Sequence, residues 1–128
     1  MKILGIGVDI VQNSRIKKAI KNKSFVSRIF AKSEISSSKK NNFTPYYFAK
    51  RFAAKEAFVK SLGLGIRKSI NFKDIYIIND KYGKPKIKFT NKVNKFIVKK
   101  FKTRNINIFL SLSDEKNYSI AFVIVQKK

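Results

Sequence analysis

The hydrophobic pattern of the chain opens with an alternating segment, residues 3–11. Aliphatic side chains occupy the even positions, whereas the odd positions include Gly5, Gly7 and Asp9. Because neighbouring side chains of a strand point to opposite faces, this segment is predicted to be a strand with one aliphatic face. The other face carries a carboxylate beside two glycines, which leave room for another group to approach the strand closely.

Further along, the apolar spacing changes to that of helices and then mixes helices with strands. The longest helix is predicted over residues 46–62, because Pro45 stands at its start and Gly63 after its end. The other predictions are short helices at 14–20 and 25–30, a helical turn at 33–35, a surface loop at 36–42, strands at 74–78, 86–89, 106–112 and 118–125, a helix at 91–101, and turns at 80–85 and 114–117. Helices interspersed with hairpins predict an α+β fold, and the 128 residues are predicted to form a single domain, 1–128.

The charge of the chain and the residue types that it lacks limit the reactions and the metal sites that are possible. The chain has 30 Lys and Arg against 7 Asp and Glu, a formal net charge of +23, so we expect an anionic partner such as nucleic acid, an acidic protein or a phosphorylated ligand. It has no histidine, which excludes Ser-His-Asp and Cys-His catalysis and leaves only oxygen ligands for a metal, favouring Mg²⁺, Mn²⁺ or Ca²⁺. With no cysteine and no apolar stretch long enough to cross a bilayer, we expect a cytoplasmic protein without a membrane partner.

Two of the seven carboxylates are candidates for a functional site. Asp9 either faces a ligand from its strand or caps the helix that follows. On the long helix, Glu56 and Lys60 lie at the margin of the apolar face, where they form either an ordinary intrahelical ion pair or part of a site. A carboxylate from a strand and one from a helix suit Mg²⁺, and Arg51, Lys55 and Lys60 would hold a phosphorylated ligand beside it. This combination is typical of phosphoryl-type transfer.

Two motifs resemble those of the holo-acyl-carrier-protein synthases, which are short phosphopantetheinyl transferases. Residues 5–11, Gly-Ile-Gly-Val-Asp-Ile-Val, resemble the family's first motif. Residues 51–63, Arg-Phe-Ala-Ala-Lys-Glu-Ala-Phe-Val-Lys-Ser-Leu-Gly, resemble the longer and more specific second motif. Similarities at Gly65-Ile66, Gly83-Lys84-Pro85 and Ser111-Leu112-Ser113 extend the resemblance over nearly the whole chain. It implies the 4′-phosphopantetheinyl transferase fold, an antiparallel sheet with one long helix that assembles as a homotrimer with active sites between subunits.

The resemblance also implies an activity. Members transfer 4′-phosphopantetheine from coenzyme A to a serine of apo-acyl carrier protein, which supplies fatty acid biosynthesis, and release adenosine 3′,5′-bisphosphate. By motif position, Asp9 and Glu56 would bind Mg²⁺ and Lys60 would neutralise the phosphate under attack, so these three form the predicted catalytic set. Arg15 and Arg28 would dock the acidic carrier protein. The residues predicted to bind coenzyme A are Arg51, Lys55, Gly65, Lys84 and Pro85.

One position departs from the family pattern. Where the family usually has histidine after Ser111-Leu112-Ser113, this chain has Asp114, which would repel a 3′-phosphate unless it is turned away or simply begins a turn. Without histidine, the carrier serine must lose its proton to a carboxylate, directly or through a metal-ordered water, and Glu56 is the nearest candidate by motif.

Two other interpretations compete with the transferase. A small basic RNA-binding protein would explain the charge and the aromatic residues, but the chain has no RNP-like aromatic motif, which disfavours nucleic acid as the partner. Basic residues in a continuous stripe would favour that alternative, and basic residues around a magnesium-binding cleft would favour the transferase. An inactive relative is the third possibility, disfavoured by intact Asp9, Glu56 and Lys60.

Overall fold

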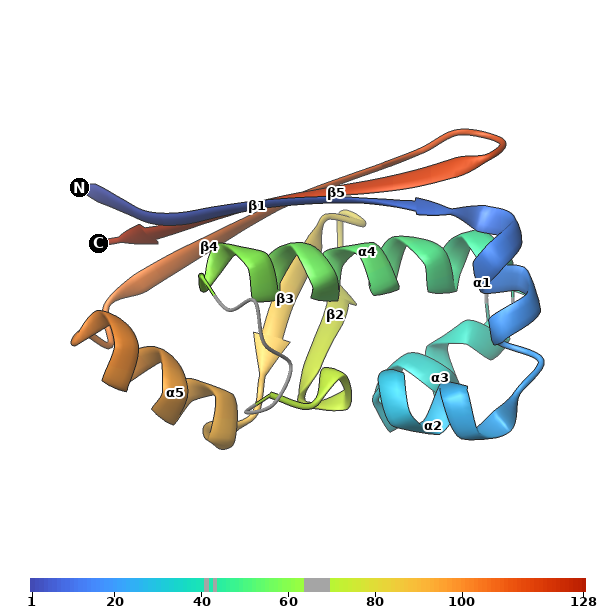
Figure 1. Cartoon of the computed structure of the whole chain (residues 1–128), viewed down its shortest axis with the longest axis horizontal. Helices are drawn as coiled ribbons and strands as arrows, with labels where there is room; N and C mark the ends of the chain where they lie inside the picture. The colour runs from blue at the N-terminus through green and yellow to red at the C-terminus, as the bar shows by residue number, and fades with distance from the viewer. Residues whose placement is uncertain (41, 43, 64–69) are drawn as a thin grey trace.

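The structure, a computed structural model, describes residues 1–40, 42, 44–63 and 70–128. Figure 1 shows a twisted sheet lying along one side of a long central helix, with a small hairpin and most of the other helices on the opposite side and one short helix at the end of the long one. The described elements are β1 (Lys2–Gln12), α1 (Asn13–Ala19), α2 (Lys23–Ile29), α3 (Lys32–Lys40), α4 (Pro45–Ser61), the 3₁₀ turn η1 (Phe72–Asp74), β2 (Ile75–Asn79), β3 (Pro85–Phe89), α5 (Asn91–Phe101), β4 (Ile106–Asp114) and β5 (Tyr118–Lys127). The predicted α+β class is confirmed.

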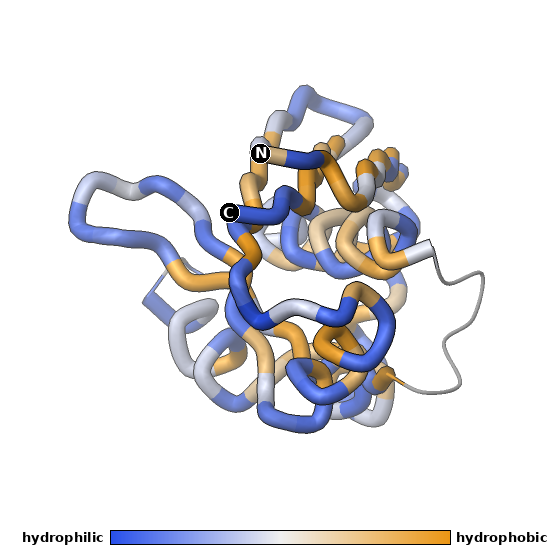
Figure 2. The backbone as a smooth tube through the Cα atoms, turned by 90° about the vertical axis from the view of Figure 1, so that its left-hand side faces the viewer, coloured by the Kyte–Doolittle hydropathy of each residue, from blue (hydrophilic) through white to orange (hydrophobic). Residues whose placement is uncertain are grey.

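Helix α4 forms the centre of the core. Its first turn is capped by Thr44, whose hydroxyl accepts a hydrogen bond from the Tyr47 N–H at 3.3 Å, and Pro45 occupies the first helical position. The chain leaves the helix at Gly63, which adopts a φ of +73°. The predicted apolar face is confirmed, since Phe48, Val59 and Leu62 are buried. Figure 2 shows hydrophobic segments gathered in the interior and hydrophilic ones in the protruding loops.

The main sheet has the antiparallel order β1-β5-β4 and packs its glycine-bearing face on α4. A Cβ at Gly5 would lie 1.8 Å from the Ser61 carbonyl oxygen, and one at Gly7 would lie 1.9 Å from that of Ala57. The close approach predicted at these glycines is therefore made by the chain's own long helix. Asp9, on the same face, is carried to the edge of that helix.

The opposite face of this sheet is apolar and exposed. We call it the outer sheet face. Ile6 is 60% exposed and Val8 53%, and Val8 lies directly across from Phe122 in the β1–β5 ladder. The exposed large apolar residues of the three strands on this face are Ile3, Ile6, Val8, Ile10, Phe109, Tyr118, Ile120 and Phe122. A contiguous apolar patch of this kind is typical of a protein–protein contact.

The surface loop predicted at residues 36–42 is wrong for residues 36–40. These residues continue α3, and residue 41 lies outside the described part of the chain. The helix is held by the buried side chains of Glu34 and Ser38, and the Ser38 hydroxyl donates to the Ile35 carbonyl at 2.5 Å. Because a serine hydroxyl can bond to the preceding turn of a helix, a serine-rich run does not exclude helix. No helix in the described ranges is both long and apolar enough to traverse a lipid bilayer.

Candidate active-site cleft

A cleft of about 490 Å³ opens between the end of β1, helices α1 and α2, and the middle of α4. It brings together four predicted site residues from distant parts of the sequence, namely Asp9, Arg15, Glu56 and Lys60. The rest of its lining is mostly apolar: Ile10, Val11, Ile16, Ala19, Phe25 and Phe52. A hollow with apolar walls and a few convergent charges has the composition of a ligand site.

Asp9 and Lys60 face each other at the entrance. The Lys60 ammonium donates to Asp9 Oδ1 at 3.1 Å and to the Val8 carbonyl at 3.0 Å. The Lys60 side chain is 54% exposed and that of Asp9 only 15%. Gln12, and not Asp9, is the N-cap residue of α1. The structure therefore excludes the interpretation in which Asp9 caps α1, and the role of its carboxylate in a site stays a prediction.

Glu56 completes the carboxylate pair. It lies on the cleft side of α4 and is only 8% exposed. Within the described ranges no cluster of three or more histidine, cysteine or acidic residues could hold a metal, so a metal in this cleft would have two carboxylate ligands, Asp9 and Glu56. Mg²⁺ commonly binds one or two carboxylates and takes its other ligands from water and substrate phosphates. The donor set of this cleft therefore fits Mg²⁺.

Arg51 and Pro85 line a separate depression of about 320 Å³, which shares no lining residue with the cleft. The Arg51 guanidinium lies 3.6 Å from the centre of the Tyr47 ring, and its Nη1 donates to the Tyr47 carbonyl at 3.3 Å. Arg51 is 6% exposed, its Nε makes no hydrogen bond within the described part of the chain, and burial lowers its pKa. The structure does not bring Arg51 into the cleft of Glu56.

Asp114 borders the same region. Its carboxylate lies 3.9 Å from the Lys50 ammonium, and Lys50 also lines the depression of Arg51. Both side chains are about one-third exposed, 31% and 37%, so this is a weak surface ion pair. The position at which the family usually has histidine therefore carries an acid that is directed to a neighbouring lysine.

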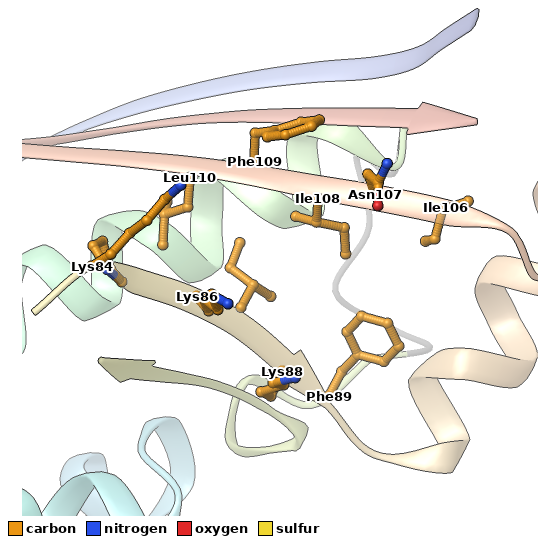
Figure 3. Close-up of a pocket in the computed structure, with 11 residues that line it drawn as sticks. Lys84, Lys86, Lys88, Phe89, Ile106, Asn107, Ile108, Phe109 and Leu110 are labelled. Carbon is orange, nitrogen blue, oxygen red and sulfur yellow. The ribbon is translucent and has the colours of Figure 1, made fainter. Parts of the chain in front are cut away.

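A groove of about 520 Å³ runs between β3 and β4, which belong to different sheets (Figure 3). Figure 3 shows Ile108 and Leu110 extending from β4 toward β3, while Phe109 lies on the other side of β4. The predicted residues Lys84 and Pro85 lie at one end of this groove. Pro85 also lines the depression of Arg51, so the two hollows adjoin.

Known proteins resemble the chain from end to end. The sequence profile of the 4′-phosphopantetheinyl transferase superfamily matches residues 5–123. The chain belongs to this superfamily. A holo-[acyl-carrier-protein] synthase of Pelagibacter ubique strain HTCC1062 is 56% identical over 128 residues, which is 100% of both chains.

Solved structures agree. The holo-[acyl-carrier-protein] synthase of Neisseria meningitidis is 38% identical with a TM-score of 0.87, covering 98% of this chain and 99% of that one. The enzyme of Bacillus anthracis, crystallised in complex with CoA (3′,5′-ADP), is 32% identical with a TM-score of 0.81, covering 100% of both. The family and fold predicted from the two motifs are confirmed.

The structure corrects the prediction that Lys55 binds coenzyme A. Lys55 is fully buried, and its ammonium contacts Glu34 Oε1 and three backbone carbonyls. Burial lowers the pKa of Lys55, while Glu34 acts in the opposite direction. An enclosed ammonium with four oxygen neighbours cannot reach coenzyme A, so the prediction that Lys55 binds it is wrong. Gly65, the other predicted residue of this region, lies outside the described residues.

Arg15 and Arg28, the two arginines predicted to dock the carrier protein, lie on two different surfaces. Arg15 is exposed at the cleft, whereas Arg28 lies on α2 and lines a neighbouring hollow of about 640 Å³ together with Lys32 and Lys73. Arg28 is exposed, and its Nε lies 3.4 Å from the Ser24 carbonyl. Both remain predictions for the carrier surface.

Sequence reasoning missed two contributors to the site. Phe25 supplies part of the cleft wall, and Glu34 neutralises Lys55. The Glu34 carboxylate sits at the third position of α3 and accepts from the Ala31 N–H at 2.9 Å, as in a capping box. The sequence lacks the full capping-box signature, because residue 31 is alanine and not serine or threonine, and nothing local indicated that Glu34 is buried.

Proposed function

We propose that this protein is a cytoplasmic enzyme of fatty acid biosynthesis, with residues 1–128 as one catalytic domain. It transfers the 4′-phosphopantetheine group of coenzyme A to a serine of apo-acyl carrier protein. The products are holo-acyl carrier protein and adenosine 3′,5′-bisphosphate. The observation that carries this proposal is the convergence of Asp9, Glu56 and Lys60 in one cleft of a chain whose full-length relatives are holo-[acyl-carrier-protein] synthases.

The reaction joins the serine oxygen to the phosphorus that bears pantetheine and breaks that phosphorus's bond to the bridging oxygen of the pyrophosphate. Mg²⁺, held by Asp9 and Glu56, would withdraw charge from the pyrophosphate. The exposed ammonium of Lys60, which is hydrogen-bonded to Asp9 at the entrance, neutralises the phosphate under attack. Glu56 accepts the proton of the serine, directly or through one ordered water.

The carrier protein binds at the mouth of the cleft. Arg15 is exposed there, beside apolar residues of α1 and α2, and its charge complements an acidic partner. With 30 basic against 7 acidic residues, the whole protein adds a long-range attraction for both anionic substrates. The same field weakens as salt concentration rises.

The working assembly is a homotrimer. Two observations support this part of the proposal. The outer sheet face leaves aliphatic and aromatic residues in water in a single chain. In addition, the Arg51 depression and the Asp9 cleft have no lining residue in common. One coenzyme A would contact both Arg51 and the Asp9 cleft most readily if these came from two copies of the chain at their interface.

The activity is tested by intact-mass spectrometry of an apo-acyl carrier protein incubated with this protein, coenzyme A and Mg²⁺, with EDTA in a parallel sample. We expect the carrier to gain the mass of one phosphopantetheine group and EDTA to suppress the gain. No gain with a folded protein and a carrier that another transferase can modify would refute the proposal. It would favour an inactive relative or a basic RNA-binding protein.

A further inference from the structure

The Lys55 ammonium ties helix α4 to the end of helix α2. It donates to the carbonyl of Ile29, the last residue of α2, at 2.8 Å. It also lies 2.5 Å from Glu34 Oε1, 2.6 Å from the Ile75 carbonyl and 3.0 Å from the Phe72 carbonyl. The last carbonyls of a helix have no partner within the helix, so a cation placed there both caps α2 and fits its dipole.

Glu34 holds the other side of the same junction. Its Oε1 accepts from the Ala31 N–H at 2.9 Å and its Oε2 from the Ile77 N–H at 3.1 Å. Its own carbonyl accepts the Tyr47 hydroxyl at 2.7 Å. The Glu34 side chain is fully buried, like that of Lys55. One ion pair thus joins α2, α3, α4 and β2.

Lys55, which belongs to this junction, directly precedes the cleft residue Glu56 in the sequence. Successive side chains of a helix point about 100° apart, so α4 presents Glu56 to the cleft and Lys55 to the end of α2. Helix α2 in turn places the Phe25 ring in the cleft wall, 6.2 Å from the ring of Phe52 on α4. Arg28 lies on the same short helix.

An apolar contact would not supply the same constraint. Burying two charges costs several kcal/mol for each ion, and an apolar pair of similar volume is often at least as stable. A methionine at position 55 could fill the space, but it could not donate to the α2 carbonyl. The specific contribution of Lys55 is therefore the position of α2.

We propose that the Glu34–Lys55 pair is a positioning device for the acyl carrier protein, fixing the α2 wall of the cleft at the distance from Glu56 that the docked carrier requires. This inference rests on the proposed function. Neither residue contacts a substrate, so both act through α2. Their loss should weaken carrier binding and leave the chemistry and coenzyme A binding intact.

The test compares wild type, Glu34→Gln, and the double variant Glu34→Gln/Lys55→Met. Glutamine at position 34 keeps one acceptor oxygen, which can serve the Ala31 N–H or the Ile77 N–H but not both. Methionine at position 55 removes the cap of α2 and leaves no unpaired buried charge. Val93→Ala in α5, where Val93 is 1% exposed, is the control for destabilisation away from α2. Circular dichroism establishes that each variant is folded at the assay temperature.

Two readouts are measured: the Kd for apo-acyl carrier protein by calorimetry without coenzyme A, and kcat and KM for each substrate. In the double variant we expect the Kd and the KM for the carrier to rise about tenfold, with kcat and the KM for coenzyme A unchanged. The Val93→Ala variant should show neither change. Should the double variant fail to fold, Glu34→Gln is expected to show a smaller rise in the same two constants, and unchanged values in that variant would overturn the proposal.

Other outcomes are equally decisive. A folded double variant with wild-type Kd and KM for the carrier would show that the pair only stabilises the protein. A fall in kcat with an unchanged carrier Kd would assign the pair to the chemistry and overturn the docking role. If wild type binds the carrier but transfers nothing, the proposed function fails, and the calorimetric comparison still decides the positioning role.

Discussion

Gly7 lies directly against the carbonyl oxygen of Ala57, where a Cβ on the glycine would come within 1.9 Å. This contact lets β1 lie on α4 without a side chain between them. Asp9 follows two residues later on the same face of the strand, and Glu56 precedes Ala57 on the helix. The two carboxylates reach one cleft because the strand and the helix approach so closely.

The first prediction concerns that contact. Replacing Gly7 by alanine should destabilise the protein by at least about 3 kcal/mol, because the added methyl group meets a backbone oxygen that cannot move alone. Urea denaturation followed by circular dichroism measures the effect. The matched control is Gly83→Ala, where a Cβ meets nothing within 4 Å and only the φ of +81° is unfavourable. That variant should lose about 1 kcal/mol, and equal losses at both positions would contradict the packing argument.

The second prediction concerns the carboxylates. Asp9→Asn and Glu56→Gln should each lower Mg²⁺-dependent transfer at least about a hundredfold while leaving the fold intact, because each removes a charged oxygen ligand without changing volume. Mg²⁺ titration calorimetry and steady-state kinetics provide the measurement. Glu115→Gln, on an exposed turn residue, removes the same charge as a control. Activity near the wild-type level in either cleft variant would exclude that residue as a metal ligand.

The sequence predicted the cleft better than it predicted the core around it. The alternation in residues 3–11 and the glycine stops of the long helix are local signals, and they sufficed to place Asp9 on a strand and Glu56 on a helix. The expectation that the two residues share one site rests on the resemblance to the synthase motifs. The serine-rich run after Glu34 was predicted to be loop, because the propensity of serine for turns is also local. Its helical state depends on contacts of Glu34 with residues more than twenty positions away, such as Lys55 and Ile77.

Lys55 shows the same limit in the functional assignment. Because Lys55 stands next to Glu56 and close to Arg51 in the sequence, it was predicted to bind the phosphate groups of a ligand. The direction of the Lys55 side chain depends on the elements that pack against α4 at this residue, namely the end of α2 and η1. Periodicity along one helix gives the angle between two side chains and does not give the partner that covers each of them.

The third prediction concerns the carrier surface. Arg15→Glu should raise the KM for acyl carrier protein about tenfold, with little effect on the KM for coenzyme A, because the change places a like charge opposite an acidic partner. Lys99→Glu on α5 makes the same change in net charge away from the cleft and is the control. The difference between the two variants should shrink as salt concentration rises. Equal KM values for Arg15→Glu and wild type would remove Arg15 from the docking surface.

The fourth prediction concerns pH. Asp80 Oδ1 accepts from the Lys84 N–H at 2.9 Å and from the Tyr82 N–H at 2.8 Å, and these bonds, led by that of Lys84, hold the pKa of Asp80 below its ordinary value of 3.8. Because the folded pKa is lowered, the stabilisation of the β2–β3 turn is present above pH 3.8 and is lost as pH falls through the folded pKa. A carboxyl-detected NMR titration should give a lower pKa for Asp80 than for a peptide spanning residues 79–85. Equal values would mean that the turn does not depend on this carboxylate.

The last prediction concerns the outer sheet face. Val8 is 53% exposed and stands across from Phe122, which is 42% exposed, so a charge at position 8 is compatible with a single folded chain but not with an apolar contact between copies. Val8→Asp should therefore convert the proposed homotrimer to monomers in sedimentation analysis and leave the circular dichroism spectrum unchanged. Tyr82→Asp, at an 83% exposed turn residue, is the control and should leave the assembly intact. If coenzyme A contacts Asp9 of one copy and Arg51 of another, the Val8→Asp monomer should also lose transfer activity, and an active monomer would show that one chain holds a complete site.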